Sequence, residues 1–166
     1  MNCTPYRANV KKLSENKLYH YSLKEILKLR RCKQEKQWKP KGLWYSCGTA
    51  WKQWGDAEDF SISTNFIYEL TLDYERILVL SSGIDIDDFT QQFSANRKGF
   101  ECFDSSNSRF IDWPTIAKDY HGIEISPYIW ERRLQYMWYY GWDVASGCIW
   151  NPKAIKELKL IHQNAI

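Results

Sequence analysis

The feature that most constrains the fold is a series of short strand-like runs separated by short helical segments. One of them, RILVLSS (76–82), is continuously apolar and predicts a central strand. Further strands are predicted at 17–22, 43–46, 65–72, 122–129 and 147–150, of which 122–126 and 147–150 are also expected to be central. Because strands and helices alternate without a regular βαβ rhythm, the pattern favours an α+β fold.

The helical segments are short, and several begin with recognisable caps. SLKEILKLRR (22–31) places Ser22 as N-cap and Glu25 three residues later, as in a capping box. Asp85 is a plausible cap for DIDDFTQQF, and Pro114 suits the first turn of WPTIAKDY. Further helices are predicted at 48–60 and 130–140, whereas residues 94–112 are expected to form a loop.

The length of 166 residues suits one domain, for which we expect a polar lead-in at 1–17 and a folded unit at 18–166. Aromatic residues make up 16% of the chain, with nine Trp, eleven Tyr and seven Phe. Such residues build a bulky core or line sites where flat ligands stack, and the core is the commoner use of any one of them.

Charge and cysteine content exclude several classes of function. A net charge of +3 is too weak to indicate nucleic-acid binding by itself, although residues 28–41 are rich in Lys and Arg. The five cysteines are scattered without the spacing of metal ligands, so no metal is expected. With no signal peptide and no apolar run of membrane-spanning length, we expect a cytoplasmic protein with no membrane partner.

The common catalytic motifs are also missing. The chain has no GxSxG nucleophile turn, no phosphate-binding loop and no dinucleotide fingerprint. Its one dense carboxylate cluster, DIDDF (85–89), suits the start of a helix better than a metal site. The remaining signal is the order of polar residues at the ends of strands.

That order resembles the ADP-ribosyltransferase fold, in the branch with a His–Tyr–Glu triad that includes diphtheria-like toxins and poly-ADP-ribose polymerases. YHYS followed by LKEILKLR is similar to the family's first strand and helix, and GLWYS is similar to its tyrosine strand. DYHGIEI and SGCIWNPKAIKEL follow in the family's order. The resemblance implies a single domain with a split, mixed or antiparallel sheet and short helices.

The resemblance also implies a site that uses NAD as a substrate. His20 would be catalytic and would bind NAD, together with Tyr21, Trp44, Tyr45, Ser46 and Ser146. The family's tyrosine position falls on Trp44, so Tyr45 lies on the opposite face of its strand. The family's glutamate position falls on Ser146, which leaves Glu124 or Asp143 as the catalytic carboxylate, and Glu124 is the one held by a strand.

These residue types suit cleavage of the nicotinamide–ribose bond. The reaction passes through an oxocarbenium-like sugar, which a carboxylate stabilises, while an aromatic face supports nicotinamide and a histidine binds a ribose hydroxyl. The expected function is therefore either ADP-ribosyl transfer to an unidentified macromolecule or hydrolysis of NAD. In the transfer reaction, the 94–112 loop would contact the macromolecule.

Two other functions stay open. The same fold without its glutamate would serve as a module that binds a nucleotide or a protein. A nucleic-acid interaction protein would use Lys28–Lys41 and exposed aromatic residues. A purely structural role is also open for each predicted site residue taken singly: His20, Trp44, Glu124 and Asp143.

Overall fold

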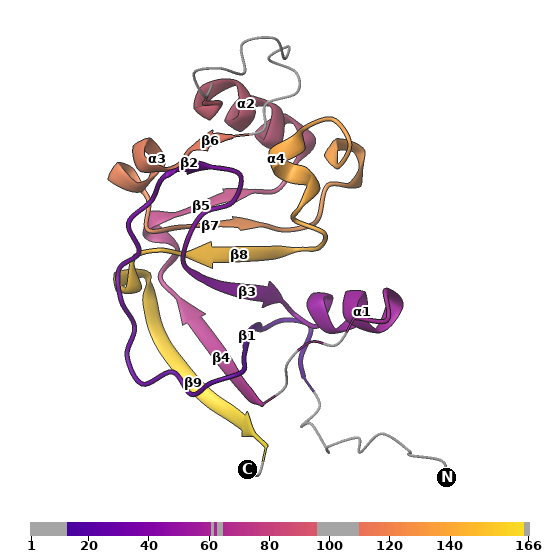
Figure 1. Ribbon diagram of the computed structural model, residues 1–166, viewed down its shortest axis with the longest axis vertical. Helices are drawn as coiled ribbons and strands as arrows, with labels where there is room; N and C mark the ends of the chain where they lie inside the picture. Colours follow the sequence, from indigo (N-terminus) through magenta and orange to yellow (C-terminus); the bar gives the residue numbers. More distant parts are fainter. Residues whose placement is uncertain (1–12, 61, 63–64, 96–109, 165–166) are drawn as a thin grey trace.

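A mixed sheet organises the described part of the chain, which in the computed structural model comprises residues 13–60, 62, 65–95 and 110–164. Within these ranges seven strands pair in the order β5-β7-β8-β3-β1-β4-β9 (Figure 1). The strands are β1 (Leu18–Ser22), β3 (Leu43–Cys47), β4 (Phe66–Leu72), β5 (Ile77–Leu80), β7 (Gly122–Ile125), β8 (Ser146–Ile149) and β9 (Ile155–Gln163). Of the paired strands, β5 and β7 are parallel and the others antiparallel.

Short helices connect these strands, so the chain is a single α+β domain. The α-helices are α1 (Ala50–Ala57), α2 (Gly83–Phe93), α3 (Trp113–Asp119) and α4 (Met137–Tyr140). Single 3₁₀ turns lie at η1 (Tyr74–Arg76), η3 (Trp130–Arg132) and η4 (Pro152–Ala154). A second, two-stranded sheet pairs β2 (Lys36–Gln37) with β6 (Ile111–Asp112).

The large sheet opens between β1 and β3. β1 pairs with β4 along its whole length, but it pairs with β3 only through Leu18 and Tyr19. Figure 1 shows the result: β5, β7 and β8 run across the upper half of the molecule, and β4 and β9 cross the lower half at an angle. Beyond Tyr19, β1 therefore diverges from β3 while it stays paired with β4.

Aromatic residues fill the core between the β5-β7-β8 part of the sheet and helices α2, α3 and α4. The largest buried side chains there include Trp113, Trp138, Trp142 and Trp150. Three of these indoles donate hydrogen bonds: Trp113 to the carbonyl of Gln37 at 3.0 Å, Trp138 to Thr90 Oγ1 at 2.9 Å, and Trp150 to the carbonyl of Tyr120 at 2.8 Å. A smaller core covers the opposite face, with Tyr45, Leu70, Leu72, Ile77, Ile149 and Ala154.

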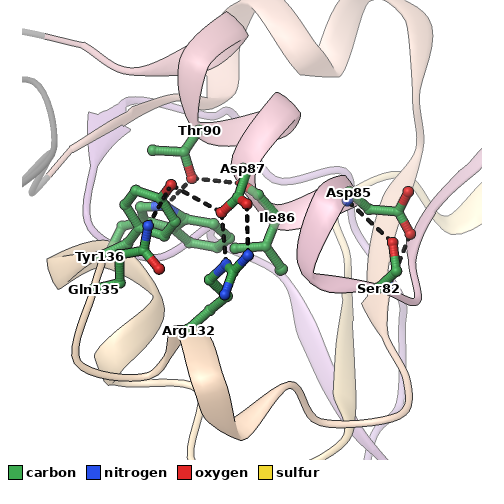
Figure 2. Close-up of polar contacts among 9 residues, drawn as sticks. Ser82, Asp85, Ile86, Asp87, Thr90, Arg132, Gln135 and Tyr136 are labelled. Atoms are coloured by element: carbon green, nitrogen blue, oxygen red, sulfur yellow. Dashed lines mark hydrogen bonds and ion pairs between the residues drawn. The ribbon is translucent and has the colours of Figure 1, made fainter.

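A polar network ties α2 to the segment between η3 and α4 (Figure 2). Arg132 donates two hydrogen bonds to Asp87, Nε to Oδ1 at 2.7 Å and Nη2 to Oδ2 at 2.8 Å. Tyr136 donates a third to Asp87 Oδ1 at 2.9 Å. A bidentate arginine–carboxylate pair restricts orientation as well as distance, so residues 132–136 are held in a defined position.

The start of α2 corrects one prediction. Its N-cap is Ser82, whose hydroxyl accepts from the Asp85 amide, and Asp85 in turn accepts from the Ser82 amide (Figure 2). Asp85 is therefore the second partner of a capping box and not the cap itself.

Two predicted helices are wrong. Residues 23–35 contain no helix, and Leu23 and Leu27 are 70% and 86% exposed there, so a helix would have no core to pack its apolar side chains against. The predicted helix at 130–140 is divided into η3 and α4, because Trp138 is fully buried whereas Leu134 is 82% exposed. One straight helix cannot bury the first of these residues while exposing the second on the same stripe.

The remaining predictions have mixed outcomes. Helices α1, α2 and α3 and the strands predicted at 17–22, 43–46, 65–72 and 147–150 are confirmed to within a few residues. The strand predicted at 122–129 is confirmed only over Gly122–Ile125, and residues 126–129 are not strand. β7 and β8 are central, but β5 is wrong as a central strand because it lies at an edge of the sheet, with Val79 42% exposed. Most of the predicted 94–112 loop and of the 1–17 lead-in lies outside the described residues. None of the helices in the described ranges has the length and apolar character needed to cross a membrane.

Candidate functional site: an aromatic pocket beside β3

A pocket of about 310 Å3 opens where β1 has separated from β3. It is bounded by β1, β3, α1, the turn before β8 and the first residue of β8. The lining residues are Tyr21, Lys39, Trp44, Trp51, Trp54, Phe60, Ile62, Gly141, Trp142, Asp143 and Ser146. The volume suits part of a nucleotide-sized ligand, such as a single heteroaromatic ring with its sugar.

Aromatic rings form most of the pocket wall. Trp44 lies 4.9 Å from Trp142, Tyr21 lies 6.0 Å from Trp51, and Trp54 lies 5.4 Å from Phe60, measured between ring centroids. The three pairs are tilted at 57°, 42° and 52° respectively, so their faces are not covered by parallel stacking on each other. Rings gathered in this way provide surfaces on which a flat ligand can stack.

Two buried donors in the pocket residues have no acceptor among the described residues: the Tyr21 hydroxyl and the Trp142 indole nitrogen. This is unusual for the protein, since the indoles of Trp113, Trp138 and Trp150 all donate hydrogen bonds. Burial also raises the pKa of Tyr21 to about 12, so its hydroxyl keeps its proton at neutral pH. Unsatisfied donors at a pocket are a common sign of a ligand or ordered water that accepts from them.

Asp143 provides the carboxylate of the pocket. It has a positive φ of 50°, in a tight turn in which the Val144 amide donates to the Trp142 carbonyl. The left-handed region is uncommon for residues other than glycine, although Asp adopts it more readily than most. Asp143 Oδ1 lies 3.5 Å from Arg133 Nη2, a long contact for an ion pair.

The two serines predicted for the site have different roles. Ser146 lines the pocket, and its hydroxyl donates to the Val144 carbonyl at 3.0 Å. Ser46 lies opposite Ser146 in the sheet but does not line the pocket. Its hydroxyl accepts from the Trp51 amide at 3.1 Å and donates to the Gly48 carbonyl at 3.1 Å, so Ser46 organises the start of α1.

His20 lies beside the pocket without lining it. Its Nδ1 is 2.6 Å from the Trp44 carbonyl oxygen, and a carbonyl can only accept, so Nδ1 carries the proton and donates. Burial lowers the pKa of His20 below its usual value of 6.5, and the hydrogen bond to Trp44 only partly offsets this effect. The ring is therefore neutral at pH 7, which leaves Nε2 as a hydrogen-bond acceptor.

Glu124 and Tyr45 lie on the other face of the sheet. Tyr45 donates to Glu124 Oε2 at 2.8 Å, and Tyr74 donates to the same oxygen at 2.7 Å. Gly147 makes room for this contact, because a Cβ at Gly147 would lie 2.3 Å from the Tyr45 hydroxyl oxygen. Side chains alternate along a strand, so Trp44 and Ser146 face the pocket and their neighbours Tyr45 and Gly147 face away from it.

The structure thus separates the two carboxylates that the sequence left open. Asp143 lines the pocket with Trp44, and Glu124 is only 8% exposed and bonded to two phenols elsewhere. The sequence favoured Glu124 because a strand holds it, but that strand turns the Glu124 side chain away from this pocket, so Asp143 is the carboxylate placed to act in it. Tyr21 lines the pocket as expected.

Lys39 and Trp142 also line the pocket, although neither was predicted as a site residue. Both approach it from connections whose course no periodicity predicts, although Trp142 is next to Asp143 in GWDVAS. Trp51 and Trp54 could have been found, because they are three residues apart and share one face of α1.

Comparisons with protein-family models, with curated proteins and with solved structures each found no match. Within the described ranges, His, Cys, Asp and Glu side chains form no group of three that could hold a metal ion.

Proposed function

We propose that this chain is an NAD-dependent ADP-ribosyltransferase, or an NAD glycohydrolase, whose pocket takes the nicotinamide end of NAD. One observation carries the proposal: Tyr21, Trp44, Asp143 and Ser146, which are far apart in the sequence, all line one pocket. These are positions at which the resemblance to the ADP-ribosyltransferase fold predicts the NAD site. In the transferase, the acceptor is a macromolecule, either a protein or a nucleic acid.

The pocket residues have chemically distinct roles in this proposal. The aromatic rings stack on nicotinamide, and the Tyr21 hydroxyl and Trp142 indole are free to donate to its carboxamide oxygen. The Ser146 hydroxyl binds a ribose hydroxyl, whereas His20 lies beside the pocket and supports β3 through its hydrogen bond to the Trp44 carbonyl. Asp143 stabilises positive charge on the ribose as the bond to nicotinamide breaks.

The reaction needs no redox partner. The bond between ribose C1′ and the nicotinamide nitrogen breaks, and nicotinamide leaves as a neutral molecule with the electron pair. A nucleophile on the acceptor, or water, forms the new bond to C1′ and loses a proton. Asp143 acts on the oxocarbenium-like state between these events, where a positioned group of opposite charge lowers the barrier.

A binding module on the same framework is the second candidate. The observation that favours it is Ser146 at the position where the family has its glutamate, together with the contact between Asp143 and Arg133. In that case the pocket binds a nucleotide without cleaving it.

Incubating the full chain with NAD and measuring released nicotinamide by liquid chromatography tests both candidates. For the enzyme, Asp143→Asn lowers the rate by about 10²–10³-fold, as loss of one electrostatic stabiliser does. Trp44→Ala weakens NAD binding by removing a stacking surface. Asp56→Asn, an exposed carboxylate on α1 paired with Lys52, is the matched control and leaves the rate unchanged.

The outcomes separate the candidates. Saturable NAD binding by the wild type without nicotinamide release supports the binding module and rules out the enzyme. Release that is equally fast in the wild type and in Asp143→Asn would show that another group supplies the charge. No binding and no release would contradict both proposals.

A further inference from the structure

Lys39 is a cation without an ion-pair partner at the wall of the pocket. Its Nζ lies 5.2 Å from the centroid of the Trp44 ring, and within the described residues it makes no salt bridge or hydrogen bond. Its stem passes over Gly141, where an added Cβ would lie 2.9 Å from Lys39 Cε. Burial lowers the pKa of Lys39, and the negative charge of Asp143 partly offsets that effect.

Arg133 is a second cation beside Asp143, and its pairing is incomplete. Its Nη2 lies 3.5 Å from Asp143 Oδ1, whereas charge-assisted hydrogen bonds are usually about 2.7–2.9 Å long. Its Nε is buried and has no acceptor among the described residues. The guanidinium carbon lies 5.3 Å from the ring centroids of both Trp130 and Tyr140.

Arg133 is held in place by its surroundings. The adjacent Arg132 forms the bidentate pair with Asp87, which fixes this segment against α2 (Figure 2). The two aromatic rings restrict the guanidinium group itself through cation–π contact. A cation fixed by contacts that leave some of its donors unused is preorganised to bind an anion.

The unsatisfied donors of the described chain gather in this part of the molecule. Four buried side-chain atoms lack a partner there: Tyr21 Oη, Tyr128 Oη, Arg133 Nε and Trp142 Nε1. Tyr21 and Trp142 line the pocket, and Tyr128 packs 5.0 Å from Trp130, one of the rings that hold Arg133. All four atoms can donate, so this region has more hydrogen-bond donors than acceptors to receive them. It also carries a net positive charge, because the two cations Lys39 and Arg133 lie near one carboxylate, Asp143.

We propose that Lys39 and Arg133 form an anion subsite beside Asp143, which takes the phosphate groups of the nucleotide whose ring enters the aromatic pocket. The proposal rests on the proposed function and extends it: in NAD, the anion is the diphosphate. The charges are complementary along the ligand. Asp143 faces the cationic nicotinamide–ribose end, and the two cations face the phosphates.

Calorimetric titration of the full chain with two fragments, inorganic pyrophosphate and nicotinamide, tests the subsite apart from turnover. Pyrophosphate reports on Lys39 and Arg133, and nicotinamide reports on the aromatic pocket. Lys39→Gln and Arg133→Gln are each expected to weaken pyrophosphate binding about tenfold or more, and to weaken nicotinamide binding much less. Trp44→Ala is expected to weaken nicotinamide binding more than pyrophosphate binding.

The matched control is Lys41→Gln, which removes the same charge two residues from Lys39. Lys41 is paired with Glu35 at 2.9 Å, so this variant should bind both fragments as the wild type does. Because Arg133→Gln could disturb the rings packed on it, Arg133→Lys is measured as well, and circular dichroism confirms that each variant is folded. The lysine keeps the charge and is expected to retain more pyrophosphate affinity than the glutamine.

The two proposals can fail separately. If the wild type does not bind pyrophosphate, or if both glutamine variants bind it like the wild type, the anion subsite is wrong, whatever happens with nicotinamide. If pyrophosphate binds through Lys39 and Arg133 but nicotinamide does not bind, the subsite stands and the NAD-dependent function is wrong. Equal losses for both fragments in a folded Arg133→Gln would indicate a general structural role and would also overturn the subsite.

Discussion

Replacing Glu124 by Gln should destabilise the protein and leave the proposed NAD cleavage intact. The carboxylate is buried and accepts hydrogen bonds from Tyr45 at 2.8 Å and Tyr74 at 2.7 Å. A hydrogen bond to a charged group contributes about 1.5–3 kcal/mol, and a neutral acceptor contributes roughly half of that. Glutamine keeps the shape and can present its carbonyl oxygen to both phenols, so the expected loss is about 2 kcal/mol in total.

For a chain of 166 residues, a loss of this size lowers the Tm by about 4–8 °C. Thermal unfolding followed by circular dichroism measures the shift, and nicotinamide release from NAD measures the activity. Asp143→Asn should give the opposite pattern, with little change in Tm and a large loss of activity.

Two results would refute this reasoning. A Glu124→Gln variant with the Tm of the wild type would show that the phenol contacts contribute no net stability. A variant that melts normally but no longer releases nicotinamide would place Glu124 in the catalytic site, against the position of its side chain. Tyr45→Phe provides the internal check, because it removes one of the two charge-assisted bonds completely and should lower the Tm by a similar amount.

Three further predictions follow from the buried groups. Gly147→Ala should destabilise the protein by about 1–3 kcal/mol in urea unfolding, because its Cβ would overlap the Tyr45 hydroxyl; unchanged stability would mean that the strand can move aside. Cys148 is fully buried and burial raises its pKa well above the usual value, so thiol labelling read by peptide mass spectrometry should modify Cys32 long before Cys148. Burial lowers the pKa of His20, so below about pH 6.5 the unfolded chain binds a proton at this ring more readily than the folded chain does. The free energy of unfolding should therefore fall as the pH drops below about 6.5, and it should fall less in His20→Gln.

Much of the fold could be predicted because strand patterns reflect local alternation. β4 shows this well: Phe66, Tyr68, Leu70 and Leu72 follow each other at every second position and are all buried. The position of a strand within the sheet is less local. Ile77–Leu80 is apolar enough for a central strand, but it lies at the edge, where its pairing with β7 and its packing on both cores account for the apolar residues.

For the site, the sequence could predict only which side chains share a face of a strand. Alternation correctly required that Trp44 and Tyr45 face opposite sides of β3. It could not show which side holds the pocket, and so it could not choose between Asp143 and Glu124. That choice depends on the turn before β8 and on the room that Gly147 leaves for Tyr45, both of which are properties of the folded chain.

The left-handed backbone at Asp143 limits which acidic residue can serve there. Its φ of 50° is adopted more readily by Asp, whose short side chain bonds locally, than by longer residues. Asp143→Glu would keep the charge, but it would add a methylene and place a less suitable residue in a strained conformation. The main-chain conformation at this turn therefore restricts which side chains it tolerates. Asp143→Glu, usually regarded as a mild substitution, is expected to be poorly tolerated here.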